Sequence, residues 1–376
     1  MNMIKQAAFD LHNPSIEKWK KTGKPVIGYT CSQVPVELFY AGGILPVRLR
    51  GVGVQGLDIA DAYYGPFICS FPKAILQSMA DENLAHLDGA VIADGCDSMR
   101  RLDECWRKAG QDYPHMNLPF FHYVNVPRKT VEHARKWFIE EMEKLTQMLE
   151  SHFSLTISNE KIVNAIRAYN KSRNLVKKLE HLRQSVPSKL LGSTSFCFSL
   201  AFQSMPPESF QGQLSEFLDN VPVIPENFSA KRILISGSAF DDIHLIQTIE
   251  DADAHVVGEN VCFGPLHQQD LISEKLDPYD ALADHYLLNC PCPRMFGRFD
   301  YRLNLLKQTI ELTKTDGVIF QNIRFCDLHA SENSLLEREL EKQGIPCIRL
   351  EREYGSETDT GRLRMRIDAF IERLSA

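Results

Sequence analysis

Short apolar runs alternate with helical segments along much of this chain of 376 residues. Lys24–Thr30 (KPVIGYT) is rich in apolar and β-branched residues, and a segment with apolar residues at helical spacing follows it. Gly89–Asp94 (GAVIAD) and Asp316–Asn322 (DGVIFQN) repeat this order. Strands that alternate with helices form parallel sheets covered by helices. The alternation therefore predicts an α/β fold.

The alternation occupies two separate parts of the chain. Further strands are expected at 45–50, 118–124, 231–236, 254–258 and 345–350. Between the two parts, helix formers at 130–182 predict two long helices, and 185–226 predicts a short helical linker. A chain of this length usually forms more than one domain. We therefore expect α/β domains at 1–150 and 229–376, with mostly parallel sheets, joined by a helical segment at 151–228.

Composition disfavours several classes of protein. The net charge of −7 and the pI of about 6.0 argue against nucleic acids and anionic membranes as partners. No apolar run reaches the roughly 18–20 residues that a membrane helix needs. The N-terminal segment also lacks the apolar centre of a signal peptide, so we expect a cytoplasmic protein. No Walker A sequence is present, so any ATP is expected to be used by a partner.

The positions of the ten cysteines separate them into groups. A disulfide framework is not expected in a chain of this size without a secretion signal. Cys31, Cys96 and Cys326 each follow an apolar strand and precede a helical segment. Ligands bind at the carboxyl ends of parallel strands, and a helix N-terminus favours the thiolate that metals require. These three thiols could therefore converge on one metal centre, with ordinary buried thiols as the alternative.

The other cysteines fall into two classes. Those expected in the apolar core, from their helix, Phe-rich and strand settings, are Cys105, Cys197 and Cys347. Those near loops, which could approach the same centre, are Cys69, Cys262, Cys290 and Cys292. Cys69, in PFICSF, is the best candidate for a fourth ligand.

Three stretches resemble the signature regions of the 2-hydroxyacyl-CoA dehydratase and benzoyl-CoA reductase family, in its D-component type of subunit. They are GYTCSQVPVELFYAGGILPVRLRG, DGAVIADGCDSMRRLDECWRK and FCDLHASENSLLERELEKQGIPCIRL. The segment DPYDALADHYL, with a CP-containing turn after it, is similar as well. The likeness covers nearly the whole chain in the same order and spacing, which is more specific than any single motif.

This resemblance implies two Rossmann-like domains with a 4Fe–4S cluster at their interface. Cys31, Cys96 and Cys326 match the ligating cysteines of the family, and three ligands leave one iron open. Family members work as heterodimers with a paralogous sister subunit, and an ATP-dependent iron–sulfur activator protein supplies one electron. In the dehydratases the acyl-CoA thioester becomes a ketyl radical anion that eliminates its hydroxyl group. We therefore expect an iron–sulfur subunit of an anaerobic lyase of this type.

Two other activities in the same family stay open. The benzoyl-CoA reductases deliver low-potential electrons to an aromatic thioester. The double-cubane cluster proteins use more cysteine ligands per chain, and Cys69, Cys262 and Cys290 or Cys292 are counterparts of these. Which acyl-CoA is bound, and whether this chain holds the active-site cluster or a relay cluster, does not follow from the sequence.

Residues beside the three cysteines are candidates for catalytic roles. Ser32 could hydrogen-bond the substrate or the cluster. Glu37, six positions after Cys31, could transfer a proton if burial raises its pKa, and a solvated glutamate or a salt bridge is the alternative. Asp97 and Asp327 are expected to be N-caps of the helices that follow.

Overall fold

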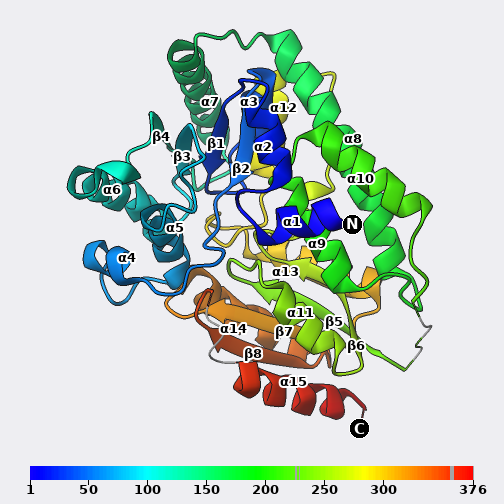
Figure 1. The fold of residues 1–376 in the computed structure, drawn as a ribbon. Coiled ribbons are helices and arrows are strands. Elements are labelled where there is room, and N and C mark those ends of the chain that lie inside the picture. Colours follow the sequence, from blue (N-terminus) through cyan, green and yellow to red (C-terminus); the bar gives the residue numbers. More distant parts are fainter. Residues whose placement is uncertain (225–226, 228, 356–359, 376) are drawn as a thin grey trace.

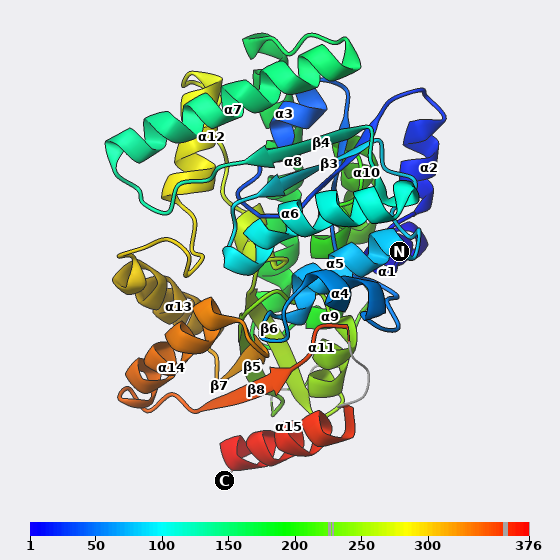
Figure 2. The same ribbon diagram turned by 90° about the vertical axis from the view of Figure 1, so that its left-hand side faces the viewer.

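The computed structural model describes residues 1–224, 227, 229–355 and 360–375. In this part of the chain two four-stranded sheets lie one above the other, and helices pack around both (Figure 1, Figure 2). Every strand pair that the structure describes is parallel. The predicted α/β class with two Rossmann-like units is confirmed.

The first sheet places two fully buried strands next to each other at its centre. Its strands are β1 (Val26–Tyr29), β2 (Leu45–Arg48), β3 (Gly89–Ala93) and β4 (Phe120–Val124). They lie in the order β2-β1-β3-β4. Every residue of β1 and β3 is buried, as expected for central strands of a parallel sheet covered on both faces. The loops that follow β1 and β3 therefore begin side by side.

The second sheet has the same topology. Its strands are β5 (Lys231–Gly237), β6 (Ala254–Asn260), β7 (Gly317–Ile323) and β8 (Cys347–Arg352), in the order β6-β5-β7-β8. Gly237 ends β5 with φ +144°, and a Cβ there would lie 1.8 Å from the carbonyl oxygen of Gln321 on β7. Only glycine allows this close approach. The strand order reverses between β1 and β3 in the first sheet and between β5 and β7 in the second. Open α/β sheets bind ligands at the carboxyl ends of the strands at such a point.

Helices cover both sheets. In the first part of the chain they are α1 (Asn2–Phe9), α2 (Pro14–Lys20), α3 (Val36–Ala41), α4 (Asp58–Tyr63), α5 (Ser70–Ala80) and α6 (Asp97–Asp112). In the second part they are α11 (Ile243–Glu250), α12 (Pro278–Ala283), α13 (Phe299–Thr313), α14 (Asp327–Glu341) and α15 (Thr360–Ser375). None of the described helices is both long and apolar enough to cross a membrane.

The expected pair of long helices consists of α7 (Glu132–Phe153) and α8 (Asn159–Gln184). The next segment was expected as a short helical linker, and it contains α9 (Gly192–Phe202) and α10 (Pro207–Asp219). Nearly all of α9 is buried, and it packs against α1 of the first unit and against α11 and β6 of the second. This segment is therefore part of the shared core. Phe228, the last residue of the expected helical segment, lies outside the described residues.

The two units share one continuous apolar core. Polar contacts also join them: the Ser70 hydroxyl donates to the Glu353 carboxylate (2.8 Å), and the Tyr354 amide donates to the Ser70 oxygen (2.8 Å). The backbone amide of Gly51 donates to the Tyr354 hydroxyl oxygen at 3.1 Å. The relative position of the two sheets is therefore fixed by packing and by hydrogen bonds.

A buried ionic cluster connects α8 to β6. Arg183 donates to Glu259 at 2.6 Å, and neither side chain is exposed. The same guanidinium also pairs with Glu180. Burial raises the pKa of Glu259 to about 7, and Arg183 opposes this rise. Removing the cation would leave two buried carboxylates without their partner.

We predict that Arg183→Met lowers the free energy of unfolding by about 3–5 kcal/mol, because breaking a buried ion pair from one side leaves uncompensated charge. Urea denaturation followed by circular dichroism measures this. Arg167→Met is the control, because Arg167 pairs with Glu274 at 3.3 Å on the surface. The control should cost less than about 1 kcal/mol. Equal, small effects of both variants would contradict the prediction.

Candidate metal centre

The structure places the predicted cysteines at the ends of strands and the starts of helices. Cys31 follows β1 by one intervening residue. Cys96, Cys326 and Cys69 are the N-cap residues of α6, α14 and α5. The expectation that Asp97 and Asp327 are the N-caps is wrong, because the cysteines hold the non-helical cap positions and the aspartates are the first helical residues.

Sheet topology brings these cysteines toward one another. Because β1 pairs with β3, Cys31 and Cys96 lie on adjacent loops. A Cβ at Gly95 would lie 3.6 Å from the Cys31 sulfur, so the loop that holds Cys96 contacts Cys31. Cys326 reaches the same region from β7 of the second sheet.

The thiols are close enough to affect each other's protonation. Burial is the main cause that raises the pKa of Cys96, and a charge on Cys31 raises it further. The backbone amides of Met99 and Ser98 lower it. Burial also raises the pKa of Cys326, as do charges on Cys69 and Cys96. The half-buried Cys31, Cys96 and Cys326 therefore lie in one neighbourhood with the buried Cys69.

The other loop cysteines belong to the same group. Burial raises the pKa of Cys262 to about 11, and charges on Cys31 and Cys96 contribute. Burial raises the pKa of Cys290 to about 12, and it raises that of Cys292 well above the ordinary value. Negative charges on Cys31 and Cys262 raise the pKa values of both thiols further. Loop cysteines from the two halves of the chain therefore face one site.

Three cysteines stay outside this group. Cys197 lies in the main apolar core, and Cys347 lies in a second cluster on the other side of the second sheet. Cys105 is half-buried and packs against the main core, with its sulfur 3.5 Å from the carbonyl oxygen of Tyr63. The prediction that these are core cysteines is confirmed.

The arrangement of these cysteines does not fit a single metal ion. Among the described residues no three Cys, His, Asp or Glu side chains stand close enough to hold one ion. An iron–sulfur cluster is larger, because its thiolates bind different irons and stand farther apart than the ligands of one ion. Several neighbouring buried thiols at helix N-termini are a donor set suited to such a cluster.

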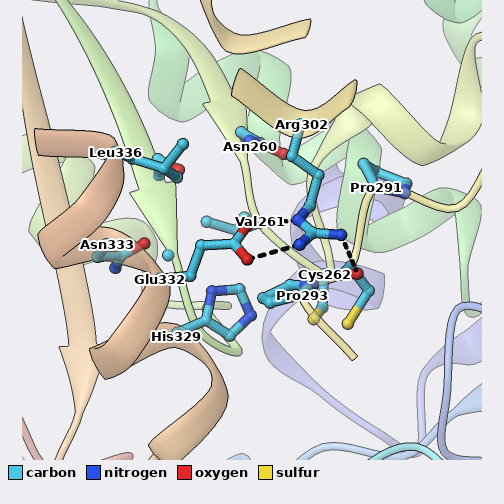
Figure 3. A pocket seen from close by; sticks show the side chains of 13 residues that line it. Asn260, Val261, Cys262, Pro291, Pro293, Arg302, His329, Glu332, Asn333 and Leu336 are labelled. Atoms are coloured by element: carbon cyan, nitrogen blue, oxygen red, sulfur yellow. Dashed lines mark hydrogen bonds and ion pairs between the residues drawn. The ribbon is translucent and has the colours of Figure 1, made fainter. Parts of the chain in front are cut away.

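A polar pocket lies between the ends of β5 and β6, the loop at 290–293, and helices α13 and α14 (Figure 3). Arg302 faces Glu332 across it at 2.6 Å and also donates to the carbonyl oxygen of Cys292 at 3.4 Å. His329 and Cys262 lie beside this pair (Figure 3). Burial lowers the pKa of His329 to about 4, and Arg302 contributes, so the imidazole is neutral at pH 7. We call this the Arg302 pocket.

A second pocket lies on the other side of the same loop. Its lining consists of Ser32, Asp270, His285, Tyr286, Asn289, Cys290, Pro291, Tyr301 and Leu305. Tyr286 comes from a π-helical turn, Asp284–Leu288, and such turns are frequent at functional sites. We call this the Ser32 pocket. The loop that holds Cys290 and Cys292 thus separates two pockets.

The structure places Ser32 at the boundary between the two units. Its hydroxyl donates to the carbonyl oxygen of Cys262 at 2.9 Å and accepts from Arg48 at 3.2 Å. Ser32 also lines the Ser32 pocket. It is therefore beside the candidate centre, and its contact with a substrate or cluster stays a prediction.

Glu37 is fully buried and makes a salt bridge. One carboxylate oxygen accepts from Arg173 of α8 at 2.6 Å, and the other accepts from the Tyr286 hydroxyl at 2.8 Å. Of the alternatives considered from the sequence, the salt bridge is the one that this geometry matches. Through Tyr286 the pair also supports the wall of the Ser32 pocket.

Two arginines near the thiols were not singled out from the sequence. Arg294 is buried and donates to the Gln33 side chain (2.9 Å) and to the carbonyl oxygens of Val126 (2.9 Å) and Pro127 (3.0 Å). Arg48 ends β2 and is also buried. The position of Arg48 inside the apolar run ILPVRLR could have indicated from the sequence that this arginine is buried.

The glycine-rich loop at 51–56 (GVGVQG) has GxGxxG spacing and follows β2. The helix after it, α4, has six residues and begins only at Asp58. A Cβ at Gly51 would lie 2.3 Å from the Cβ of Ala74, so this glycine serves helix packing. The loop is not the strand–turn–helix arrangement that binds a dinucleotide.

Comparison with known proteins agrees with this geometry. Residues 31–374 match the family model described as 2-hydroxyglutaryl-CoA dehydratase, D-component. The chain belongs to this family. Relatives include the (R)-phenyllactyl-CoA dehydratase beta subunit of Clostridium sporogenes, 24% identical over 94% of this chain and 93% of that protein.

Two further relatives show the breadth of the D-component family. The putative dehydratase subunit YjiM of Escherichia coli is 27% identical over 94% of this chain and 93% of that protein. A benzoyl-CoA reductase subunit of Thauera aromatica is 24% identical over 90% of this chain and 89% of that protein. Both dehydratase and reductase subunits are therefore similar to this D-component chain.

We predict that Glu37→Gln lowers the free energy of unfolding by about 3 kcal/mol, because Arg173 then keeps a buried charge without a carboxylate. Urea denaturation of the purified chain measures this change. Glu208→Gln is the control, because Glu208 is exposed and accepts a hydrogen bond from Tyr40, and it should change stability by less than about 0.5 kcal/mol. Unchanged stability of Glu37→Gln, together with lost enzyme activity, would instead assign Glu37 to proton transfer.

Proposed function

We propose that this chain is the iron–sulfur subunit of a 2-hydroxyacyl-CoA dehydratase-like lyase. The observation that carries the proposal is the group of half-buried thiols that follow the strands of both sheets, in a chain of the D-component family. The relatives named as dehydratase subunits support an acyl-CoA thioester as the substrate and a paralogous sister subunit as the partner in a heterodimer.

The proposed cofactor is a 4Fe–4S cluster held by Cys31, Cys96 and Cys326. When bound, it supplies one electron and, with three protein ligands, an iron with an open position for a Lewis-acid contact. The helix N-termini at Cys96 and Cys326 stabilise their thiolates. Cys69 is the candidate for a fourth ligand. If it binds, no iron stays open, and the chain acts as an electron relay for the sister subunit.

The substrate is proposed to bind in the Ser32 pocket. Ser32 and the hydroxyl of Tyr301 offer polar groups beside Cys290. The Glu37–Arg173 pair holds Tyr286 at the wall of this pocket. An ATP-dependent iron–sulfur activator protein supplies the electron. The thioester takes the electron up as a ketyl radical anion, and the α-hydroxyl group leaves as water after it gains a proton. The β-carbon then loses a proton, and the electron is returned as the α,β double bond forms.

An oxidoreductase of the same family is the second candidate. It is favoured by the additional thiols of Cys69, Cys262, Cys290 and Cys292, which face the same site. A double-cubane reductase would use several of them as ligands. Similarity to one of the benzoyl-CoA reductase subunits supports the related possibility of an aromatic acyl-CoA as the electron acceptor.

We predict that Cys96→Ala and Cys326→Ala each lose most of the bound iron and stay folded, because each removes one thiolate from the cluster. Iron and acid-labile sulfide are measured after anaerobic reconstitution, and circular dichroism reports folding. Cys347→Ala is the matched control, because its thiol is in the second apolar cluster, and it should retain full iron. Full iron in both ligand variants would refute the ligand assignment.

Iron content of the wild-type chain separates the two candidates. About four irons per chain are expected for the dehydratase-like protein, whereas a double cubane would give about eight. The count is made on anaerobically purified chain, and Cys262→Ala provides the comparison. Under the first proposal this variant keeps the wild-type iron content, and a marked loss would favour the double cubane.

A further inference from the structure

Arg48 is a buried cation without a carboxylate partner in the described part of the chain. Its side chain is 3% exposed. Its guanidinium donates to the neutral Ser32 hydroxyl at 3.2 Å and also hydrogen-bonds the Tyr29 side chain. Its Nε has no hydrogen-bond partner among the described atoms. A buried charge of this kind is costly unless an opposite charge meets it.

Each of the other buried arginines in the described part of the chain has either a carboxylate partner or several backbone carbonyl oxygens as hydrogen-bond acceptors. Those paired with carboxylates are Arg50, Arg173, Arg183, Arg302 and Arg352. Arg232 donates to the carbonyl oxygens of Thr313, Gln184 and Ser185 at the ends of two helices. Arg294 likewise donates to several backbone carbonyl oxygens. Among the described residues, Arg48, Arg232 and Arg294 are thus the buried arginines without a carboxylate partner, and of these three it is Arg48 whose Nε has no hydrogen-bond partner.

Neither of two nearby ionisable side chains outside the cysteines, Tyr29 and Glu37, provides a negative charge for Arg48. The guanidinium carbon lies 5.4 Å from the ring centre of Tyr29 and 4.9 Å from that of Phe263. Burial raises the pKa of Tyr29 to about 12, so this phenol is neutral. Glu37 is occupied by Arg173. The two rings stack with the cation but supply no negative charge.

The remaining ionisable neighbours are the thiols. Ser32, the hydrogen-bond partner of Arg48, is adjacent to Cys31 and donates to the carbonyl oxygen of Cys262. Arg48 lowers the pKa of Cys262, against the larger effect of burial. The cation thus faces a site that becomes strongly negative when several thiolates hold a cluster.

We propose that Arg48 is the counter-charge of the bound cluster and raises its reduction potential. This inference rests on the proposed function. A fixed cation beside the cluster stabilises the reduced form more than the oxidised form, because the reduced form has one more negative charge. The rings of Tyr29 and Phe263 hold the guanidinium in place from two units of the fold. Arg48 would thus tune the cluster electrostatically, without being one of its ligands.

The test is a spectroscopic redox titration of the reconstituted holoprotein. In Arg48→Met the cluster should be harder to reduce. At the potential where the wild type is half-reduced, the ratio of reduced to oxidised cluster should fall about tenfold, equal to ~59 mV for one electron. Arg48→Lys keeps the charge and should restore most of the wild-type potential.

Arg50→Met is the matched control. Arg50 lies two positions farther along the same segment, is 2% exposed, and pairs with Asp241 at 3.5 Å. The control removes the same charge from a site whose counter-ion is a carboxylate, and it should leave the cluster potential unchanged. A shift in Arg50→Met as large as that in Arg48→Met would overturn the inference.

A measurement without iron completes the test. The apo form of Arg48→Met should unfold at the same urea concentration as the apo wild type, or at a higher one, because an uncompensated buried cation is removed. The stabilisation gained on loading the cluster should become smaller. If Arg48→Met does not fold, Arg48→Gln is used for the same comparison.

The outcomes separate the two proposals. A wild-type chain that binds no cluster after reconstitution would refute the proposed function. A wild-type chain that binds the cluster, with an unshifted potential in Arg48→Met, would refute the role of Arg48 and leave the proposed function standing. Loss of the cluster from folded Arg48→Met, with retention in Arg48→Lys, would support the counter-charge.

Discussion

The structure depends on how two parallel sheets direct the carboxyl ends of their strands toward a common boundary. Loops that follow β1 and β3 of one sheet and β7 of the other contain cysteines, and helices begin directly after three of the cysteines at this boundary. Helix N-termini bring partial positive charge, and the neighbouring arginines add full charges. These charges oppose the effect of burial, which nevertheless raises the pKa values of Cys96, Cys262 and Cys326. Thiols of this kind lose their protons when a metal binds them.

The two halves of the chain use one topology twice. The orders β2-β1-β3-β4 and β6-β5-β7-β8 are the same path through a four-stranded sheet. Cys96 and Cys326 occupy equivalent positions in it, each as the N-cap after the third strand of its unit, and Asp follows both. Cys31 has no cysteine counterpart, because Ser238 follows β5. Cys96 and Cys326 therefore lie at equivalent positions of the two units, whereas Cys31 is found in the first unit alone.

Much of the fold was predictable, because local patterns determine strands and helices in alternating α/β chains. The apolar runs at Gly89–Asp94 and Asp316–Asn322 became central strands, and the cysteines after them lie where the sheets meet. Contacts between distant segments were not predictable in the same way. Glu37 pairs with Arg173 from a helix in another part of the chain, and no local spacing reveals that pairing.

Other differences have similar causes. The segment at 185–226 has the Ser and Pro content of a linker, but its phenylalanines form a buried aromatic cluster, with Phe198 against Phe210 and Phe217. The cap expected at Asp97 lies one position earlier, because sequence locates helix starts only approximately. Arg48 was not singled out from the sequence, although it is a charge in an apolar run, and its enclosure needs Phe263 from the second unit. Its surroundings became visible only when both units were in place.

The continuous apolar core between the units has a consequence for biogenesis. Two halves that are joined by shared packing cannot swing apart to admit iron and sulfide without unfolding part of that core. The proposed cluster would therefore enter while the chain is still closing, or through the solvent-facing side of the boundary, where the exposed rings of Phe67 and Phe325 contact each other edge to face. Apart from that side, the boundary opens only together with the core.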